Sequence, residues 1–424
     1  MTDLFATGTP EAQGAALALF HEAGEHVRWH LDPGNVGLLS RAMREGGRNV
    51  TVVLPADDLS PEQTRIAYEK ELQPTLRRLR GQVPIELSTG RPYFFPPPAL
   101  DISTNDLCGL ECNMCGNRAK SRDPDTMLPE QIRALIADAA DWGIGRVALT
   151  GAGEPFRDPN MLEHLRHANG LGLLVTITTN GFPISEKIAA ELARSTISVS
   201  VSIHGATDET HDEIVGVPKA AANAWRAIQR MVAARQPGSK LSINVSTVIQ
   251  RRNLHEIPAL VRRARAEGID GINIQPVNLQ HGSFRGDDIV RRDDLILMGR
   301  LWPAKKEHAE LDAMFDELDR VKAELGRFVH PTPERLALLR RYFRDSSRDA
   351  LGVACRVGEA FLAVDHRGQI KPCYRLPWSH GDARLKSLRA LWNSQAYART
   401  RALVDACPLT CLNNCFFREK RVAA

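Results

Sequence analysis

Three cysteines lie close together, at Cys108, Cys112 and Cys115, in a chain of 424 residues that contains only eight cysteines. Three residues separate the first pair and two separate the second, and no histidine is near them in the sequence. A structural zinc site needs four ligands, which this loop does not supply. The three thiolates instead indicate a 4Fe–4S cluster with three irons held by the protein and the fourth open to a small molecule.

The other five cysteines form a second group near the end of the chain, after a long stretch without any cysteine. Such crowding is not typical of a disulfide framework, so a second metal site is expected. Five thiols can hold one four-iron cluster with one left over, but cannot supply the ligands for two. The left-over thiol is a spare ligand, an inert thiol or a hydrogen-atom donor, and a zinc ribbon is the alternative for the whole group. The five are Cys355, Cys373, Cys407, Cys411 and Cys415.

The composition is that of a globular protein, with 43% hydrophobic residues and a net charge of only +4. This small charge gives no reason to expect a nucleic-acid partner. No run is long and apolar enough for a membrane span, and the first residues lack the pattern of a secretion signal. The expected location is therefore cytoplasmic, and the length predicts two or three domains.

Six strand-like runs alternate with helix-like segments between about residues 99 and 278. Such alternation predicts a parallel sheet covered by helices, and six units favour an open, partial (β/α)6 barrel over a closed barrel of eight. Sites in such folds lie at the carboxyl ends of the strands, which is where the Cys108 loop falls. The runs are 99–103, 146–150, 173–178, 197–203, 242–249 and 271–275.

The rest of the chain divides around this barrel, which we place at 96–285. Residues 1–95 are expected to form an α/β cap or recognition region that begins with helix-like sequence, and prolines near residue 96 mark its end. Residues 286–350 are charged and helix-like and predict a connector. Residues 351–424 carry the second cysteine group, with a hairpin predicted over 361–373.

The Cys108 loop, placed after the first strand, resembles the signature of the radical SAM superfamily. This resemblance implies that the open iron binds S-adenosylmethionine (SAM), whose reductive cleavage gives a 5′-deoxyadenosyl radical that abstracts a hydrogen atom from the substrate. Thr150–Pro155 resembles the family's Gly-Gly-Glu-Pro motif, which binds the SAM amino group. Ala152 stands where the first glycine is usual, so the backbone approach there departs from the family pattern.

Further positions resemble those that line SAM in the family. They follow the second, third, fourth, fifth and sixth strands, and Met114 matches an apolar position beside the adenine. His204 lies where many relatives carry aspartate, and either faces the substrate or caps the strand end. The resemblance thus assigns SAM to Met114, Gly151, Gly153, Glu154, Pro155, Thr178, Asn180, Ser200, Ser202, Ser246 and Gln275.

The C-terminal cysteines and the predicted hairpin resemble the SPASM/Twitch extension of this superfamily, which carries auxiliary Fe–S clusters. The cysteine count favours the Twitch-like case, with one auxiliary 4Fe–4S cluster held by Cys355, Cys373 and two of Cys407, Cys411 and Cys415. A hydrogen donor to a substrate radical would be one of these last three. The resemblance also implies a flavodoxin or ferredoxin as the reductant.

The cofactors leave the substrate open between two enzyme classes. We favour a small polar metabolite, such as a sugar, aminocyclitol or nucleoside in natural-product biosynthesis, that is oxidised, epimerised or rearranged. The alternative is a maturase that cross-links or modifies a ribosomally made peptide. Leader-binding domains begin with a hairpin sheet, whereas residues 1–95 begin with helix-like sequence. A non-catalytic Fe–S sensor is a weaker alternative, and no cobalamin-binding motif is present.

Overall fold

The computed structural model describes residues 2–5, 14–15, 17–18, 20, 26–31, 35–44, 49–54, 83–90, 92–115, 122–278, 300–373, 379–405, 412 and 417–419. The chain forms two compact units, of which the first contains residues 1–96, Asp138–Gly143 and Leu388–Ser394 and the second contains the rest. The finer division at residues 95, 285 and 350 stays a prediction.

A four-stranded parallel sheet is the centre of the first unit, with its strands in sequence order. Helix α2 (Val36–Arg44) packs through Leu39 and Ala42 into a core around the fully buried Trp29. The predicted α/β character is confirmed. The described residues of the helix-like stretch, 14–15, 17–18 and 20, are helical, but a strand that was not predicted precedes them. The strands are β1 (Thr2–Phe5), β2 (Val27–His30), β3 (Val50–Leu54) and β4 (Ile85–Leu87).

The second unit is built on an eight-stranded sheet of order β10-β9-β8-β7-β6-β5-β12-β13. Six of its strands follow one another in sequence and all pair in parallel, which confirms the predicted partial barrel. These are β5 (Leu100–Ser103), β6 (Arg146–Thr150), β7 (Leu174–Thr179), β8 (Ile197–Ser202), β9 (Leu241–Ile249) and β10 (Gly271–Pro276).

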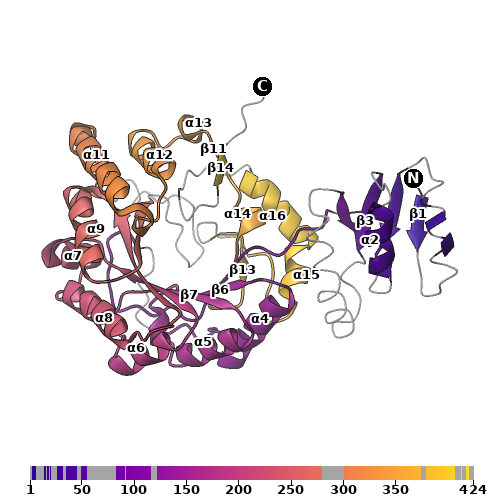
Figure 1. Cartoon of the computed structure of the whole chain (residues 1–424), viewed down its shortest axis with the longest axis horizontal. Helices are drawn as coiled ribbons and strands as arrows, with labels where there is room; N and C mark the ends of the chain where they lie inside the picture. The colour runs from indigo at the N-terminus through magenta and orange to yellow at the C-terminus, as the bar shows by residue number, and fades with distance from the viewer. Residues whose placement is uncertain are drawn as a thin grey trace. The chain divides into compact units, whose positions relative to one another are not determined.

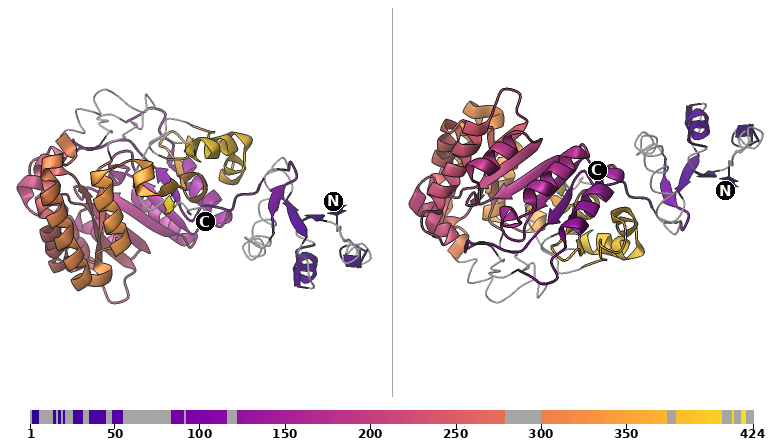
Figure 2. Two further views of the ribbon diagram at one scale, coloured as in Figure 1. Left: turned by 90° about the horizontal axis from the view of Figure 1, so that it is seen from above. Right: turned by 90° about the horizontal axis from the view of Figure 1, so that it is seen from below.

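Helices cover the outer side of these strands, because every second strand residue is a buried aliphatic side chain that needs an apolar cover. Figure 1 shows the strands inside an arc of helices, and Figure 2 shows the same helices and strands from above and from below. One of these helices, α7, was not predicted from the sequence; Thr207 caps its start and Gly216, at φ 70°, ends it. The helices are α4 (Pro129–Asp141), α5 (Met161–Gly170), α6 (Glu186–Ala193), α7 (Asp208–Val215), α8 (Ala220–Ala234) and α9 (Ile257–Ala266).

After the last barrel strand the chain forms two long helices and then returns to the opposite edge of the sheet. The predicted hairpin is present as β12 (Leu362–Val364) and β13 (Ile370–Lys371), and β12 adds in parallel to β5, which the sequence did not reveal. Of the described helices, none combines the length and apolarity needed to cross a membrane. The remaining named elements of this region are α11 (His308–Leu325), α12 (Pro333–Arg344), α13 (Arg348–Leu351), β11 (Val353–Cys355), α14 (Val357–Ala360), α15 (Leu388–Trp392), α16 (Gln395–Asp405) and β14 (Phe417–Glu419).

Candidate active site

The Cys108 loop is packed directly against the turn that follows β6. The amide of Glu154 donates to the carbonyl of Leu107 at 2.6 Å. A Cβ atom placed on Gly153 would lie 1.9 Å from that same carbonyl oxygen, so only glycine permits this approach. Gly153 is therefore required for packing alone, without reference to any ligand, because it allows the cysteine loop to lie against the turn.

The other side of the loop is held by the end of helix α7. Glu111 and Asn113 donate their amides to the carbonyls of Val215 and Ile214, both at 2.9 Å. The last carbonyls of a helix have no partner within the helix, and here the cysteine loop supplies one. The loop is thus fixed by backbone hydrogen bonds on both sides, through a helix that the sequence did not predict.

Of the three loop cysteines, Cys108 and Cys112 are half-buried and Cys115 is exposed. Burial raises the pKa of the Cys108 thiol, and the negative charges of Glu154 and Cys115 raise it further. A bound metal offsets this cost, because a coordinating thiol is held deprotonated by the metal charge. Three thiols on one loop that is held from both sides fit a three-thiolate 4Fe–4S site.

Glu154 is buried and its carboxylate joins two turns of the barrel. One oxygen accepts the Thr179 hydroxyl at 2.6 Å and the Phe156 amide at 3.2 Å, and the other accepts the Asn180 amide at 2.7 Å. Burial raises the pKa of Glu154 to about 6, although these hydrogen bonds lower it. The sequence assigned this group to the SAM ammonium, whereas the structure shows it bonded to the neighbouring turn.

Two neighbours of this carboxylate were not singled out in the sequence. Thr179 is buried and carries the hydroxyl that bonds Glu154, whereas Thr178, the residue we had chosen, is exposed. The Asn105 side chain donates to the Glu154 carbonyl at 3.1 Å and accepts the Leu107 amide at 2.9 Å. The alternation of inward and outward residues in β7 is the signal that separates the two threonines.

Five of the positions assigned to SAM by resemblance share the inner side of the barrel sheet. Strand register pairs Thr178 with Ser200, and Ser202 with Ser246, so these side chains lie on one face. Gln275 lies on the same face because Asn273, two residues earlier, pairs with Ser246. The structure therefore brings together Thr178, Ser200, Ser202, Ser246 and Gln275, which the sequence could place only strand by strand.

This inner face is polar but uncharged along the four strands β7 to β10, all of which are described. Its side chains are mainly hydroxyls and amides; Asn244, for example, donates to the hydroxyls of Ser198 and Ser242 at 3.2 and 3.1 Å. The opposite face of the same strands is aliphatic and buried beneath the helices. A polar molecule is therefore expected on the inner face, where small side chains leave room for it.

The remaining assigned positions lie in the turns at the carboxyl ends of the strands or in the cysteine loop. Met114 is buried at 9% exposure, two residues beyond the half-buried Cys112. Gly151 tolerates no side chain, since a Cβ there would lie 2.8 Å from the carbonyl oxygen of Gly153. Pro155 begins a short 3-10 helix, and the Asn180 side chain accepts the Phe182 amide at 3.0 Å.

His204 caps the end of β8. Its Nδ1 accepts the Val248 amide at 3.3 Å, its own amide donates to Nδ1 of His211 at 3.0 Å, and the two rings stack. Burial lowers the pKa of His204 to about 3 and that of His211 to about 4. Both imidazoles are therefore neutral at physiological pH, and of the two roles left open by the sequence the structure favours the cap.

The second cysteine group is only partly described. Cys355 ends β11, which pairs antiparallel with β14 so that Cys355 lies opposite Phe417. Cys355 and Cys373 both pack against a small apolar cluster around Val357 and Val404. Both described thiols therefore contact the same apolar group of side chains. The other three predicted ligands, Cys407, Cys411 and Cys415, lie outside the described residues, so the fourth ligand and the hydrogen donor stay predictions.

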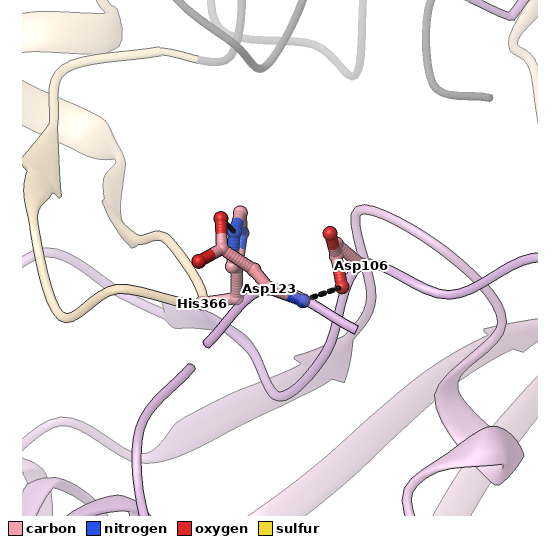
Figure 3. Close-up of side chains that lie close together, drawn as sticks. All are labelled: Asp106, Asp123 and His366. Carbon is pink, nitrogen blue, oxygen red and sulfur yellow. Dashed lines mark hydrogen bonds and ion pairs between the residues drawn. The ribbon is translucent and has the colours of Figure 1, made fainter. Parts of the chain in front are cut away.

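A buried group of acidic and basic side chains joins the segment before Cys108 to the hairpin before Cys373, and the sequence did not reveal it. Ligand-type atoms of Asp106, Asp123 and His366 lie within 4.8 Å of one another (Figure 3). Arg367 donates from Nε to one carboxylate oxygen of Asp123 at 2.8 Å. A guanidinium therefore already supplies a positive charge beside this carboxylate. The sequence signal that could have indicated this group is the Asp-His-Arg-Gly turn, which contains more charged residues than a turn requires.

Comparison with protein families identifies the two cysteine regions. The family described as the Radical SAM superfamily matches residues 102–264, and the SPASM iron-sulfur cluster-binding domain matches residues 355–416. The chain contains a radical SAM domain and a SPASM domain. It is therefore an enzyme that uses SAM and a 4Fe–4S cluster, and its SPASM domain implies auxiliary iron–sulfur chemistry.

Two kinds of curated relative align with this radical SAM enzyme over most of its length. An AdoMet-dependent heme synthase of Methanosarcina barkeri is 24% identical over 306 residues, which cover 69% of this chain and 82% of the relative. A PqqA peptide cyclase of Xanthomonas axonopodis is 24% identical over 316 residues, which cover 72% and 77%.

Solved structures share the fold at low sequence identity. Streptococcus suis SuiB bound to the precursor peptide SuiA aligns at a TM-score of 0.56 and 17% identity, over 92% of this chain and 80% of that one. The protein anSMEcpe with bound AdoMet and the Kp18Cys peptide aligns at 0.53 and 16%, over 72% and 83%. At these identities the likeness concerns the fold.

Proposed function

We propose that this radical SAM enzyme modifies a ribosomally made peptide, forming a cross-link or a related change at a side chain. The observation that carries the proposal is the alignment with PqqA peptide cyclases, which covers 72% of this chain. The fold neighbours solved with a precursor peptide and with the Kp18Cys peptide agree with it. The small polar metabolite favoured by the sequence thus becomes the second candidate.

The preference for a metabolite rested on the poor match of residues 1–95 to a leader-binding domain, which was inferred from a helical start. The first described element there is instead β1. The four strands are parallel, however, so this sheet is not the hairpin sheet of a leader-binding domain either. A cap and a peptide-recognition module both remain consistent with this region, and the proposal does not depend on the choice.

The inner face of the barrel suits a neutral polar substrate. Hydroxyls and amides on β7 to β10 can donate to and accept from peptide groups, which are neutral and carry both kinds of partner. A phosphorylated metabolite would call for arginine or lysine on this face, and these strands have none there.

The chain's own residues have three roles in this proposal. Cys108, Cys112 and Cys115 would hold a cluster that, when reduced, would supply the one electron that cleaves SAM to methionine and a 5′-deoxyadenosyl radical. The turns at Gly151–Pro155 and Asn180, with Met114 and the inner-face residues Thr178, Ser200, Ser202, Ser246 and Gln275, orient SAM and the substrate. Cys355 and Cys373, with two of the last three cysteines, hold an auxiliary cluster. A flavodoxin or ferredoxin remains the predicted reductant.

The test uses the reconstituted full-length enzyme under anaerobic conditions with SAM, dithionite and candidate precursor peptides encoded beside its gene. We expect 5′-deoxyadenosine to form together with a peptide that has lost two hydrogen atoms for each cross-link, detected by mass spectrometry. Cys112→Ala serves as the matched control, because it removes a ligand of the first cluster without touching the inner face.

The alternative outcome is equally clear. If 5′-deoxyadenosine forms with a sugar, aminocyclitol or nucleoside that is converted, while no neighbouring peptide changes mass, the metabolite candidate replaces the peptide. If no substrate of either class raises 5′-deoxyadenosine above the level of Cys112→Ala, both candidates fail.

A further inference from the structure

The Asp123 carboxylate binds the turn of the SPASM hairpin, between β12 and β13. One of its oxygens accepts from Arg367 through Nε at 2.8 Å and Nη2 at 2.5 Å, and from His366 Nε2 at 3.2 Å. The carboxylate side chain is only 7% exposed, whereas the Arg367 side chain is 51% exposed. Arg367 therefore reaches from the surface to pair with a buried acid.

Backbone hydrogen bonds extend this contact in both directions. The Met127 amide donates to the His366 carbonyl at 2.7 Å, which holds the segment after Asp123 against the turn. The Asp123 amide donates to Oδ1 of Asp106 at 3.3 Å (Figure 3). Asp106 lies two residues before Cys108 in the sequence, so the contacts begin beside the first cysteine loop.

The other end of this series of contacts lies beside the second cysteine group. His366 and Arg367 precede β13, and β13 leads through Pro372 to Cys373. The turn itself is well ordered by Asp365, whose carboxylate accepts the amides of Arg367 and Gln369 at 3.0 and 2.9 Å. Hydrogen bonds thus join Asp106, two residues before Cys108, to the hairpin that leads to Cys373.

The charges favour a permanent ion pair at this point. Hydrogen bonds from Arg367 and His366 outweigh burial and lower the pKa of Asp123 to about 2, so the carboxylate is ionised at any working pH. Two guanidinium nitrogens on one buried oxygen give a directional contact that a single ammonium cannot match. Because Arg367 occupies the oxygen that a cation would need, an ion pair fits this group better than a metal site.

We propose that Asp123 is a positioning residue that fixes the Cys373 end of the auxiliary site relative to the Cys108 loop. The inference rests on the proposed function only in assuming that both sites carry clusters. Loss of the pair should let the hairpin turn move, so that radical formation continues while the step that needs both sites becomes inefficient.

The test compares the reconstituted full-length variants Asp123→Asn and Arg367→Lys with wild type. Asp123→Asn keeps the size and the backbone amide but removes the charge, and Arg367→Lys keeps the charge but loses the two-nitrogen contact. Glu163→Gln is the matched control, since it breaks the exposed Arg133–Glu163 pair, at 2.9 Å, elsewhere in the barrel.

Two quantities are measured: the distance distribution between the two reduced clusters by pulsed dipolar EPR, and the 5′-deoxyadenosine formed per modified substrate. For Asp123→Asn we expect a broader distribution and a ratio raised about tenfold, because small misplacements of reacting groups are costly. Arg367→Lys should fall between this variant and wild type, and Glu163→Gln should match wild type.

An unchanged distance distribution in both variants would overturn the inference, as would a variant that no longer binds iron at the Cys108 loop, since that would make Asp123 a structural support of one site. If no peptide is modified even by wild type, the proposed function fails but the EPR distances still decide the positioning role. Arg367→Lys keeps the test open should Asp123→Asn not fold, because Arg367 is half exposed.

Discussion

The two cysteine regions differ in how the chain holds them. The Cys108–Cys115 loop is short, continuous and fixed from both sides by backbone hydrogen bonds, to Leu107 through Glu154 and to the carbonyls that end α7. In the SPASM region, Cys355 ends the short strand β11, Cys373 follows the short strand β13, and both pack against a small apolar group of side chains. The conformation of the first site is held by the barrel, whereas the conformation of the second site is expected to depend more on its bound metal.

This difference has a physical origin in the amount of surrounding core. The barrel buries aliphatic residues from six strands, so its loops are anchored at both ends by rigid elements. The strands β11 and β13 are three and two residues long, which is too short to be stable alone. A site made from such pieces is expected to gain much of its order from the bound metal.

The largest expected effects are those of removing one cysteine ligand from each site in turn, which should affect SAM cleavage and substrate conversion differently. In Cys112→Ala, formation of 5′-deoxyadenosine should fall to background, because the SAM-binding cluster loses one of its three ligands. In Cys373→Ala, SAM cleavage should persist while conversion of the substrate is lost. Product analysis of the two variants under identical anaerobic conditions checks this, and equal losses of SAM cleavage would contradict the separation.

A second large effect is expected where the first site is most tightly packed. In Gly153→Ala the new Cβ would overlap the Leu107 carbonyl at 1.9 Å, so the cysteine loop must move. We expect SAM cleavage to fall about 100-fold, as for other displaced catalytic groups. Gly145→Ala is the control, since nothing lies within 4 Å of its Cβ and its activity should not change.

Iron removal should sharpen the contrast without any mutation. After chelation, amide hydrogen exchange should increase in Val353–Cys355 and in the hairpin 362–371, because these short strands lose the order that the metal supplies. Strands β7 to β9 should stay protected. Equal increases in both regions would show that the barrel also depends on its cluster.

Much of this organisation could be predicted from the sequence. The period-two patterns at 146–150 and 242–249 placed two barrel strands to within one residue, because alternating or fully apolar runs leave little choice of structure. Helix α7 was missed because Asp208–Val215 is mostly polar and short. The pairing of β12 with β5 joins residues far apart in sequence, and no local pattern reports such a pairing.

For the candidate site, too, local patterns could be predicted from the sequence and contacts between distant segments could not. The resemblance to the radical SAM signature named residues on successive strands, and strand order and side-chain alternation then place five of them on one inner face. The contacts of Glu154 with Thr179 and of Asp123 with Arg367 could not be predicted, because they depend on how turns from different units approach one another. Thr178 and Thr179 differ by one position, and only the register decides which one is buried.

The smallest expected effect concerns the histidines behind the first site. His204 and His211 connect the end of β8 to α7, the helix that holds the cysteine loop. Burial lowers both pKa values, to about 3 and about 4; Asp208 and Asp212 oppose the shift at His211, and Arg263 adds to it. Because the folded-state values lie below the ordinary value near 6.5, their contribution to stability is complete above that pH and is lost as the pH falls.

We therefore expect the urea midpoint of unfolding to decrease between pH 7.5 and 5.5, with exchange rising first in α7 and the Cys108 loop. His211→Asn retains an acceptor for the His204 amide but cannot take up a proton. Its urea midpoint should depend on pH less steeply than that of wild type, because unfolding of the variant takes up about one proton fewer. An identical pH dependence in wild type and His211→Asn would show that the support of the first site does not involve this pair.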